Sequence, residues 1–351
     1  MSVPNAIFID TSVLDEQNYN FSSVATSAFL EAVKDQKVIL LLPDPTRREI
    51  ERHIEERSQE VINALEQAKR KAPFLKKWKA WPIKRGNPML GYELRKIANN
   101  EWNSFLEHFK VENLDYDGVR LEEVMNWYDH QRAPFGRKKR KEFPDALALA
   151  ALLAYVRKNS ISVAMVSRDK DFERACEFYS ELLYFPSLPA LTEALLSADK
   201  RVAQVKEVIE SDTTLIVEKI KEDFLSLCFY HEIDEADIED VEVDDITIGK
   251  VRIIHIGGNE VVIAFEATVG YSAYVTADDH SSASIDSSED WYRVWQEYRG
   301  TVQDQTEISG IAKCSVSPDW KTVEEVVMFE IQEDDIYVEE VPEEIYRKGE
   351  E

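Results

Sequence analysis

Residues 143–172 have the sequence FPDALALAALLAYVRKNSISVAMVSRDKDF, which carries the clearest fold signal in the chain. Between positions 146 and 156, apolar side chains would lie on every face of a helix apart from one tyrosine hydroxyl, so this helix is expected to be buried. The β-branched, apolar run 161–166 predicts a short strand covered on both faces. Asp145 stands at the start of the helix, and two further acids follow the strand. Ligands of open α/β sheets bind at that end of the strands, so the stretch predicts an α/β fold with a ligand site.

The same strand pattern recurs along the first part of the chain. Short apolar runs at 6–9, 37–42 and 182–185 alternate with helical segments. This alternation predicts βαβ units, in which a parallel sheet carries helices on both faces as a three-layer structure.

The composition limits the class of protein. A chain of 351 residues predicts about two domains, and its 44% hydrophobic and 31% charged residues are typical of soluble globular protein. No apolar run reaches the length of a membrane span, and no secretory signal is visible at the first residues. Three widely spaced cysteines fit reduced thiols, and six histidines form no metal-ligand pattern. We therefore expect a cytoplasmic protein with no membrane partner.

The excess of negative over positive charge is confined to the C-terminal part. Residues 201–351 contain 12 Lys and Arg against 38 Asp and Glu, and subtraction from the totals of 42 and 68 leaves 30 of each in residues 1–200. An acidic chain would ordinarily argue against a nucleic-acid partner. Because the first 200 residues are neutral overall, that argument does not apply to them.

Three regions are predicted from these patterns. Residues 1–200 form the α/β domain, residues 201–245 a helical and acidic connector, and residues 246–351 an acidic domain rich in antiparallel strands. In the last region, glycines at 257–258 and at 270 are taken as turns between strands.

Five acids occupy comparable places in the α/β pattern. Asp10 ends the first strand, Glu49 lies in the first turns of the helix after the second, Asp145 opens the buried helix, and Asp169 ends a later strand, with Asp171 as a fifth candidate. These places converge at the carboxyl edge of a parallel sheet. Clustered carboxylates repel one another unless a cation lies between them, and Mg²⁺ or Mn²⁺ prefers such oxygen ligands. The sequence therefore predicts a metal site.

Each acid also has an ordinary structural explanation. Asp10 and Asp169 could cap helices, Glu49 fits a capping box with Thr46, and Asp145 suits the dipole of its helix. The occurrence of all of them at strand exits and helix starts of one sheet favours the metal site.

Four segments resemble the motifs of the PIN domain family. They are AIFIDTSVL at 6–14, LPDPTRRE at 42–49, FPDA at 143–146 and SRDKDF at 167–172. The resemblance covers roughly residues 5–190, and only the four motifs together are specific. A long stretch between the second and third motifs, together with the acidic C-terminal domain, departs from the small toxin-type PIN proteins. The chain looks closer to a larger bacterial PIN-like group with such an insertion and a β-rich tail.

The resemblance implies a Mg²⁺- or Mn²⁺-dependent nuclease, most often acting on RNA. Asp10, Glu49, Asp145 and Asp169 would be its catalytic and metal-binding acids, with Asp171 as an additional ligand. The expected reaction is phosphodiester hydrolysis by a metal-activated water, as in an endoribonuclease. No serine or cysteine has a histidine partner at motif spacing, so a covalent nucleophile is not expected.

Other features suit a nucleic-acid substrate but have structural alternatives. A basic run precedes the third motif and is expected either to contact phosphates or to form a solvated loop. It consists of Arg137, Lys138, Lys139, Arg140 and Lys141. Three tryptophans (Trp78, Trp81, Trp102) either stack on bases or pack between helices. The acidic run 232–245 is either a solvated linker or a mimic of phosphate charge.

Three functional hypotheses follow. The first is a nuclease with RNA rather than DNA as its partner, whose C-terminal domain regulates, recognises or forms a homo-oligomer. The second is a catalytically silent PIN-fold protein that binds nucleic acid or acts as a scaffold. The third gives the main role to protein binding by the C-terminal domain, with the nuclease as its effector.

Overall fold

The protein is described from a computed structural model, in which the chain divides into two compact units, Met1–Leu195 and Leu196–Glu351. The residues that the structure describes are 3–34, 36–72, 74, 77, 90–135, 142–231, 236–279, 282, 284–286, 291–293 and 296–347.

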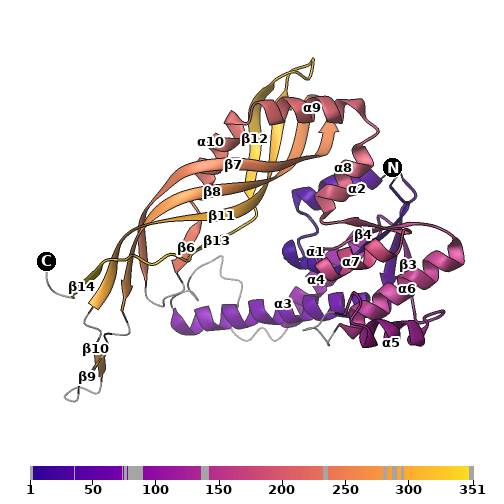
Figure 1. Ribbon diagram of the computed structural model, residues 1–351, viewed down its shortest axis with the longest axis horizontal. Helices are drawn as coiled ribbons and strands as arrows, with labels where there is room; N and C mark the ends of the chain where they lie inside the picture. Colours follow the sequence, from indigo (N-terminus) through magenta and orange to yellow (C-terminus); the bar gives the residue numbers. More distant parts are fainter. Residues whose placement is uncertain are drawn as a thin grey trace. The chain divides into compact units, whose positions relative to one another are not determined.

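A five-stranded parallel sheet in the order β3-β2-β1-β4-β5 forms the centre of the first unit (Figure 1). Its strands are β1 (Ala6–Ile9), β2 (Ile39–Pro43), β3 (Lys110–Leu114), β4 (Val163–Val166) and β5 (Leu182–Phe185). Strands β1 and β4 are buried along their whole length, as their unbroken apolar runs predict. Strand β3 was not predicted, because it lies at the sheet edge and only Leu114 is buried.

Helices cover both faces of this sheet. The helices are α1 (Thr11–Glu16), α2 (Val24–Val33), α3 (Asp44–Lys71), α4 (Leu90–Leu106), α5 (Leu121–Asp129), α6 (Phe143–Asn159), α7 (Lys170–Phe178) and α8 (Leu188–Leu196). Helices α5, α6 and α7 share one apolar core with the face that carries Phe8 and Met165. The remaining five share a second core on the opposite face, which carries Ile7 and Val166. The predicted three-layer α/β fold is confirmed.

The second unit is built on an antiparallel sheet in the order β12-β11-β8-β7. These strands are β7 (Asp237–Gly257), β8 (Glu260–Asp278), β11 (Gln296–Val316) and β12 (Val323–Ile331). Short pairings accompany the sheet: β14 (Ile345–Arg347) joins β11, β13 (Asp335–Val338) lies parallel to β6 (Cys228–His231), and β9 (Ser284–Asp286) pairs with β10 (Trp291–Arg293). The predicted β-rich C-terminal part is therefore present.

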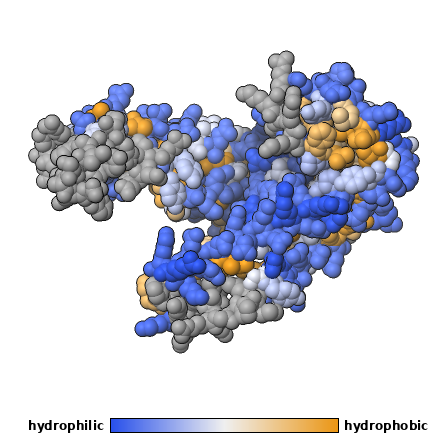
Figure 2. Space-filling view, turned by 90° about the horizontal axis from the view of Figure 1, so that it is seen from below, coloured by the Kyte–Doolittle hydropathy of each residue, from blue (hydrophilic) through white to orange (hydrophobic). Residues whose placement is uncertain are grey.

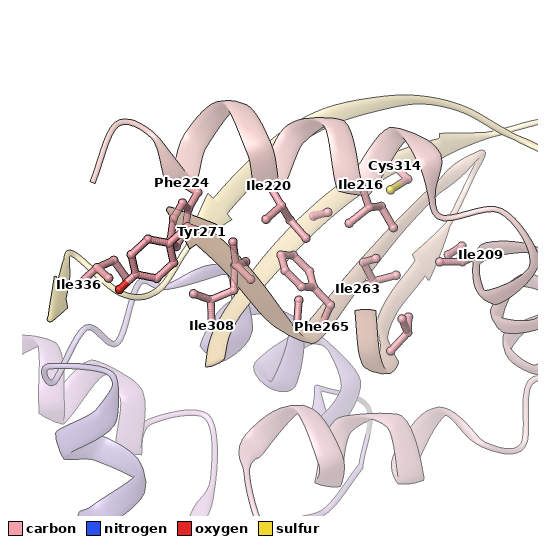
Figure 3. Close-up of a cluster of buried hydrophobic side chains, with 14 of the residues drawn as sticks. Ile209, Ile216, Ile220, Phe224, Ile263, Phe265, Tyr271, Ile308, Cys314 and Ile336 are labelled. Carbon is pink, nitrogen blue, oxygen red and sulfur yellow. The ribbon is translucent and has the colours of Figure 1, made fainter. Parts of the chain in front are cut away.

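Two helices, α9 (Lys200–Ser211) and α10 (Thr214–Phe224), pack on one face of that sheet. Figure 3 shows Ile216, Ile220 and Phe224 of α10 directed at sheet residues that include Phe265 and Tyr271. Residues 201–245, expected to connect two domains, thus belong to the second unit in their described part. Their apolar residues recur at the spacing that buries one face of a helix or of a strand. The many acids between them made this spacing hard to recognise in the sequence.

The described part of the acidic run also belongs to the second unit. Residues 237–245 open strand β7, where Ile238, Val241 and Val243 pack toward the core while the acids between them remain exposed. Strong negative charge on such an edge strand discourages pairing with other chains.

Gly270 lies inside β8 and does not form the predicted turn, because β8 continues unbroken past it. A side chain at this position would collide with the Asp245 carboxylate on the neighbouring strand. The Asp245 carboxylate therefore occupies the space that a side chain at position 270 would fill. The turn expected at 257–258 is present between β7 and β8.

The face of the molecule seen in Figure 2 is mostly hydrophilic, with apolar residues gathered in small areas. Among the described helices, none combines the length and the apolar character that crossing a membrane requires. Cys176, Cys228 and Cys314 are free thiols.

Candidate metal centre

The exits of β1 and β4 lie side by side at the carboxyl edge of the parallel sheet. The strands pair along their full length, and the backbone N–H of Asp10 donates to the Val166 carbonyl at 2.9 Å. The strand order reverses direction between β1 and β4, which is the switch point where α/β sheets bind ligands. The residues that follow these two strands are therefore brought together.

Asp10 is held at this edge by hydroxyl groups. Its side chain is 7% exposed and accepts hydrogen bonds from Ser12 and from Ser167, the latter at 2.8 Å. Burial raises the pKa of the Asp10 carboxyl, and the two hydroxyl bonds only partly offset that effect. An ionised Asp10 is thus expensive unless a positive charge lies nearby.

Three further carboxylates meet close to this point. One oxygen from each of Glu142, Asp145 and Asp169 lies within 4.8 Å of the others. Glu142 is the residue before the first turn of α6, Asp145 lies in that turn, and Asp169 precedes α7. The pKa of Asp145 is raised to about 9, chiefly by burial and further by its hydrogen bond with Glu142 and by the charges of Asp10, Glu142 and Glu49.

These residues fit a hard divalent cation. Mg²⁺ binds oxygen at about 2.0–2.1 Å, so two oxygens on opposite sides of one ion are about 4 Å apart. The 4.8 Å limit among the three carboxylates therefore requires only small side-chain movements. The raised pKa of Asp145 also indicates that a cation is needed, because carboxyls this close resist ionisation without one.

Glu49 approaches the centre from α3. Its Oε2 accepts a hydrogen bond from the Thr11 hydroxyl at 3.2 Å, and its Oε1 accepts one from Arg52 at 3.1 Å. The capping box with Thr46 is not formed, because α3 starts at Asp44 and Thr46 is already buried inside the helix. Glu49 therefore belongs to the surroundings of the acidic cluster and not to a helix cap.

Asp169 both caps helix α7 and belongs to the carboxylate cluster, the two roles expected for it. Its Oδ1 accepts the backbone N–H of Asp171 at 2.7 Å as the cap of α7, and one of its oxygens also belongs to the group of three carboxylates. Asp171 is 6% exposed and forms an ion pair with Arg174 at 3.1 Å. It lies outside that group, so its predicted role as a ligand remains a hypothesis.

Glu142 was missed from the sequence although a signal was present. It stands three positions before Asp145 at the start of the same helix, and residues with this spacing share one helix face. The sequence analysis assigned the basic run directly before it to phosphate contact and did not include Glu142 among the acids.

The basic run 137–141 lies outside the described residues, as do Trp78 and Trp81. Trp102 is 6% exposed and stacks on Phe105 with ring centres 5.6 Å apart, next to Phe21. Trp102 therefore packs in the core and offers no surface for a base.

A parallel three-layer domain with carboxylates gathered at its switch point defines a candidate metal-binding α/β protein. The family model of the PIN domain matches residues 7–172, in agreement with the resemblance that the four sequence motifs carry. PIN domains generally are metal-dependent nucleases. No curated protein and no solved structure shows significant similarity to the chain.

Proposed function

We propose that this protein is a divalent-metal-dependent nuclease that hydrolyses phosphodiester bonds, with RNA as its substrate and internal cleavage as its mode. The observation that carries the proposal is the convergence of Glu142, Asp145 and Asp169 beside the buried Asp10 in a PIN domain.

The residues around the centre divide into two roles. Glu142, Asp145, Asp169, Asp10 and Glu49 would bind Mg²⁺ or Mn²⁺, because their donors are all carboxylate oxygens. The Ser12 and Ser167 hydroxyls hold the Asp10 carboxylate in place. When bound, the cation would lower the pKa of a water molecule and neutralise charge on the phosphate.

Substrate binding in this proposal depends on positive charge outside the acidic cluster. Arg137, Lys138, Lys139, Arg140 and Lys141 precede Asp145 in the sequence and would supply sequence-independent contacts to phosphates. Carboxylates alone repel a polyanion, so the cation and these side chains together would make the site attractive to nucleic acid. The acidic second unit would serve recognition, regulation or self-association, and a cytoplasmic location fits the free thiols.

A nuclease assay tests the proposal. The full-length protein is incubated with single-stranded RNA, transfer RNA and DNA, each with Mg²⁺, Mn²⁺ or EDTA. We expect internal cleavage of RNA with either metal, none with EDTA, and none by Asp145→Asn, which keeps the side-chain size. Glu31→Gln, an exposed single-charge change on α2, is the matched control and should retain activity.

Two results would contradict the proposal. Full activity of Asp145→Asn would remove the acidic cluster from the reaction. Metal-dependent folding and tight RNA binding without any cleavage would favour the silent, nucleic-acid-binding alternative.

A further inference from the structure

Helix α3 is longer than the core of its unit requires. Its buried residues, Thr46, Ile50, Ile54 and Ser58, repeat every four positions and end at Ser58, although the helix continues to Lys71. Figure 1 shows α3 running outward from the parallel sheet as the longest helix of this unit. About half of α3 therefore serves something other than the core.

The first part of α4 packs antiparallel to α3, beside residues 55–62. Arg95 forms an ion pair with Glu55 at 2.9 Å, and a Cβ at Gly91 would lie 3.0 Å from the Ile62 side chain. Residues 59–71 of α3, with the start of α4 packed beside Ile62, are hereafter the helical arm. Close packing at Gly91 fixes the two helices against each other.

The end of the arm is positively charged. Lys69, Arg70 and Lys71 lie in the last turn of α3; Lys69 is half-buried, whereas Arg70, Lys71 and Lys77 beyond the helix are exposed. Arg70 is 81% exposed and reaches Glu66 only at 3.9 Å. Between Glu66 and Glu93 the sequence contains eight Lys and Arg and no acid. Basic residues in a last turn suit the helix dipole, but that explanation does not extend to the rest of this segment.

Apolar and aromatic side chains are exposed just beyond the end of α3 and in the first part of α4. Phe74 is 70% exposed, Tyr92 56% and Ile97 57%. An exposed aromatic ring beside lysine and arginine is the combination with which proteins hold single-stranded nucleic acid, by stacking on bases and contacting phosphates. A protein partner for such a surface would have to be strongly acidic.

We propose that the end of the helical arm is a second nucleic-acid-binding element, which contacts the substrate away from the bond that is cut. This inference rests on the proposed nuclease function for its choice of ligand. The described side chains that would make contact are Lys69, Arg70, Lys71, Phe74, Lys77 and Tyr92.

The geometry of α3 sets the length of substrate that can contact both the acidic cluster and the end of the helical arm. Glu49 and Lys71 are 22 residues apart on one helix; at 1.5 Å per residue their backbones are separated by about 33 Å. A stacked strand rises about 3.4 Å along its axis per nucleotide, so the arm reaches phosphates about ten nucleotides from the acidic cluster. The substrate class is therefore a nucleic acid with at least about ten nucleotides on one side of the cleaved bond.

Binding measured in EDTA tests the arm without cleavage. A fluorescein-labelled 30-nucleotide RNA is titrated with the full-length protein and with the triple variant Lys69→Gln/Arg70→Gln/Lys71→Gln, in which Gln preserves helix propensity. Loss of three phosphate contacts should lower the slope of log affinity against log salt by about 2, which is about 100-fold in affinity at 0.1 M salt. A single variant, Phe74→Ala, should weaken binding without changing the salt slope.

The matched control carries the same charge change at the opposite edge of the sheet. Lys34 and Lys37 precede β2, Lys110 is the first residue of β3, and all three are exposed. Their triple change to Gln should leave affinity within about twofold. Equal losses in both triple variants would attribute the effect to net charge and overturn the proposal. So would unchanged RNA affinity of the arm variant, or a loss of binding to phosphatidylserine vesicles with RNA binding intact.

The two proposals fail separately. A protein that binds RNA through the arm but cleaves nothing contradicts only the nuclease function. A protein that cleaves RNA with an arm variant of unchanged affinity contradicts only the arm.

Discussion

The raised pKa of Asp145 predicts that metal binding expels a proton. Burial and the neighbouring Glu142 hold the pKa of Asp145 near 9, so at pH 7 the Asp145 carboxyl retains its proton when no cation is present. A metal ion binds the ionised carboxylates and must displace that proton. Affinity for Mn²⁺ should therefore rise with pH.

The size of the effect follows from the same value. A pKa of about 9 lies two units above pH 7, and each unit is a factor of ten. The site should bind Mn²⁺ about 100-fold more weakly at pH 7 than when fully ionised, with about a tenfold gain per pH unit between 6 and 8. Close to one proton should be released for each ion bound.

The same shift affects stability in the absence of metal. Because the folded pKa lies above the ordinary value of 3.8, the fold favours the protonated acid. The stabilisation from this preference is complete below about pH 4 and is lost as the pH rises through 9. At pH 8 without metal, Asp145→Asn should therefore have a higher melting temperature than the wild type, and added Mn²⁺ should stabilise the wild type more than the variant.

Calorimetric titration with Mn²⁺ at pH 6.5 and 7.5, in two buffers of different ionisation enthalpy, measures both affinity and proton release. Asp145→Asn should bind more weakly and lose most of the pH dependence, whereas Glu31→Gln should behave as the wild type. An affinity that stays constant from pH 6 to 8, with no proton released, would refute the reasoning.

Three further predictions concern other parts of the chain. Glu142→Gln should weaken Mn²⁺ binding by at least tenfold in the same titration, and an unchanged constant would exclude this residue as a ligand. Replacing the basic residues 137–141 with serine should weaken RNA binding for all sequences alike and flatten its salt dependence; an unaltered slope in filter binding would mean that the run is only solvated. Gly310→Ala should destabilise the second unit by about 1–3 kcal/mol in urea unfolding, because its Cβ would lie 2.7 Å from a carbonyl oxygen and press on the Phe265 ring. Gly258→Ala meets no atom within 4 Å and should cost only about 1 kcal/mol, from its positive φ; equal losses would contradict the packing argument.

The sequence by itself determined the three-layer domain and the places of its acids. Strands such as β1 and β4 are buried on both faces, so they appear as unbroken apolar runs that local reading detects. Because strand exits of one parallel sheet share an edge, Asp10, Asp145 and Asp169 were expected near one another before any distance was known. The α/β fold class and the resemblance to the PIN domain, which a family model matches over residues 7–172, followed from these runs and motifs.

Only the tertiary structure decided the features that depend on residues distant in sequence. Glu142 joins the cluster because the start of α6 is held against the exit of β4. Strand β3 exists because β2 offers it backbone partners, although its own side chains are mostly polar. Helices α9 and α10 and the acidic start of β7 belong to one core because their apolar residues meet across the sheet. A local pattern alone does not fix such contacts, since the burial of each residue is set by which distant element covers it.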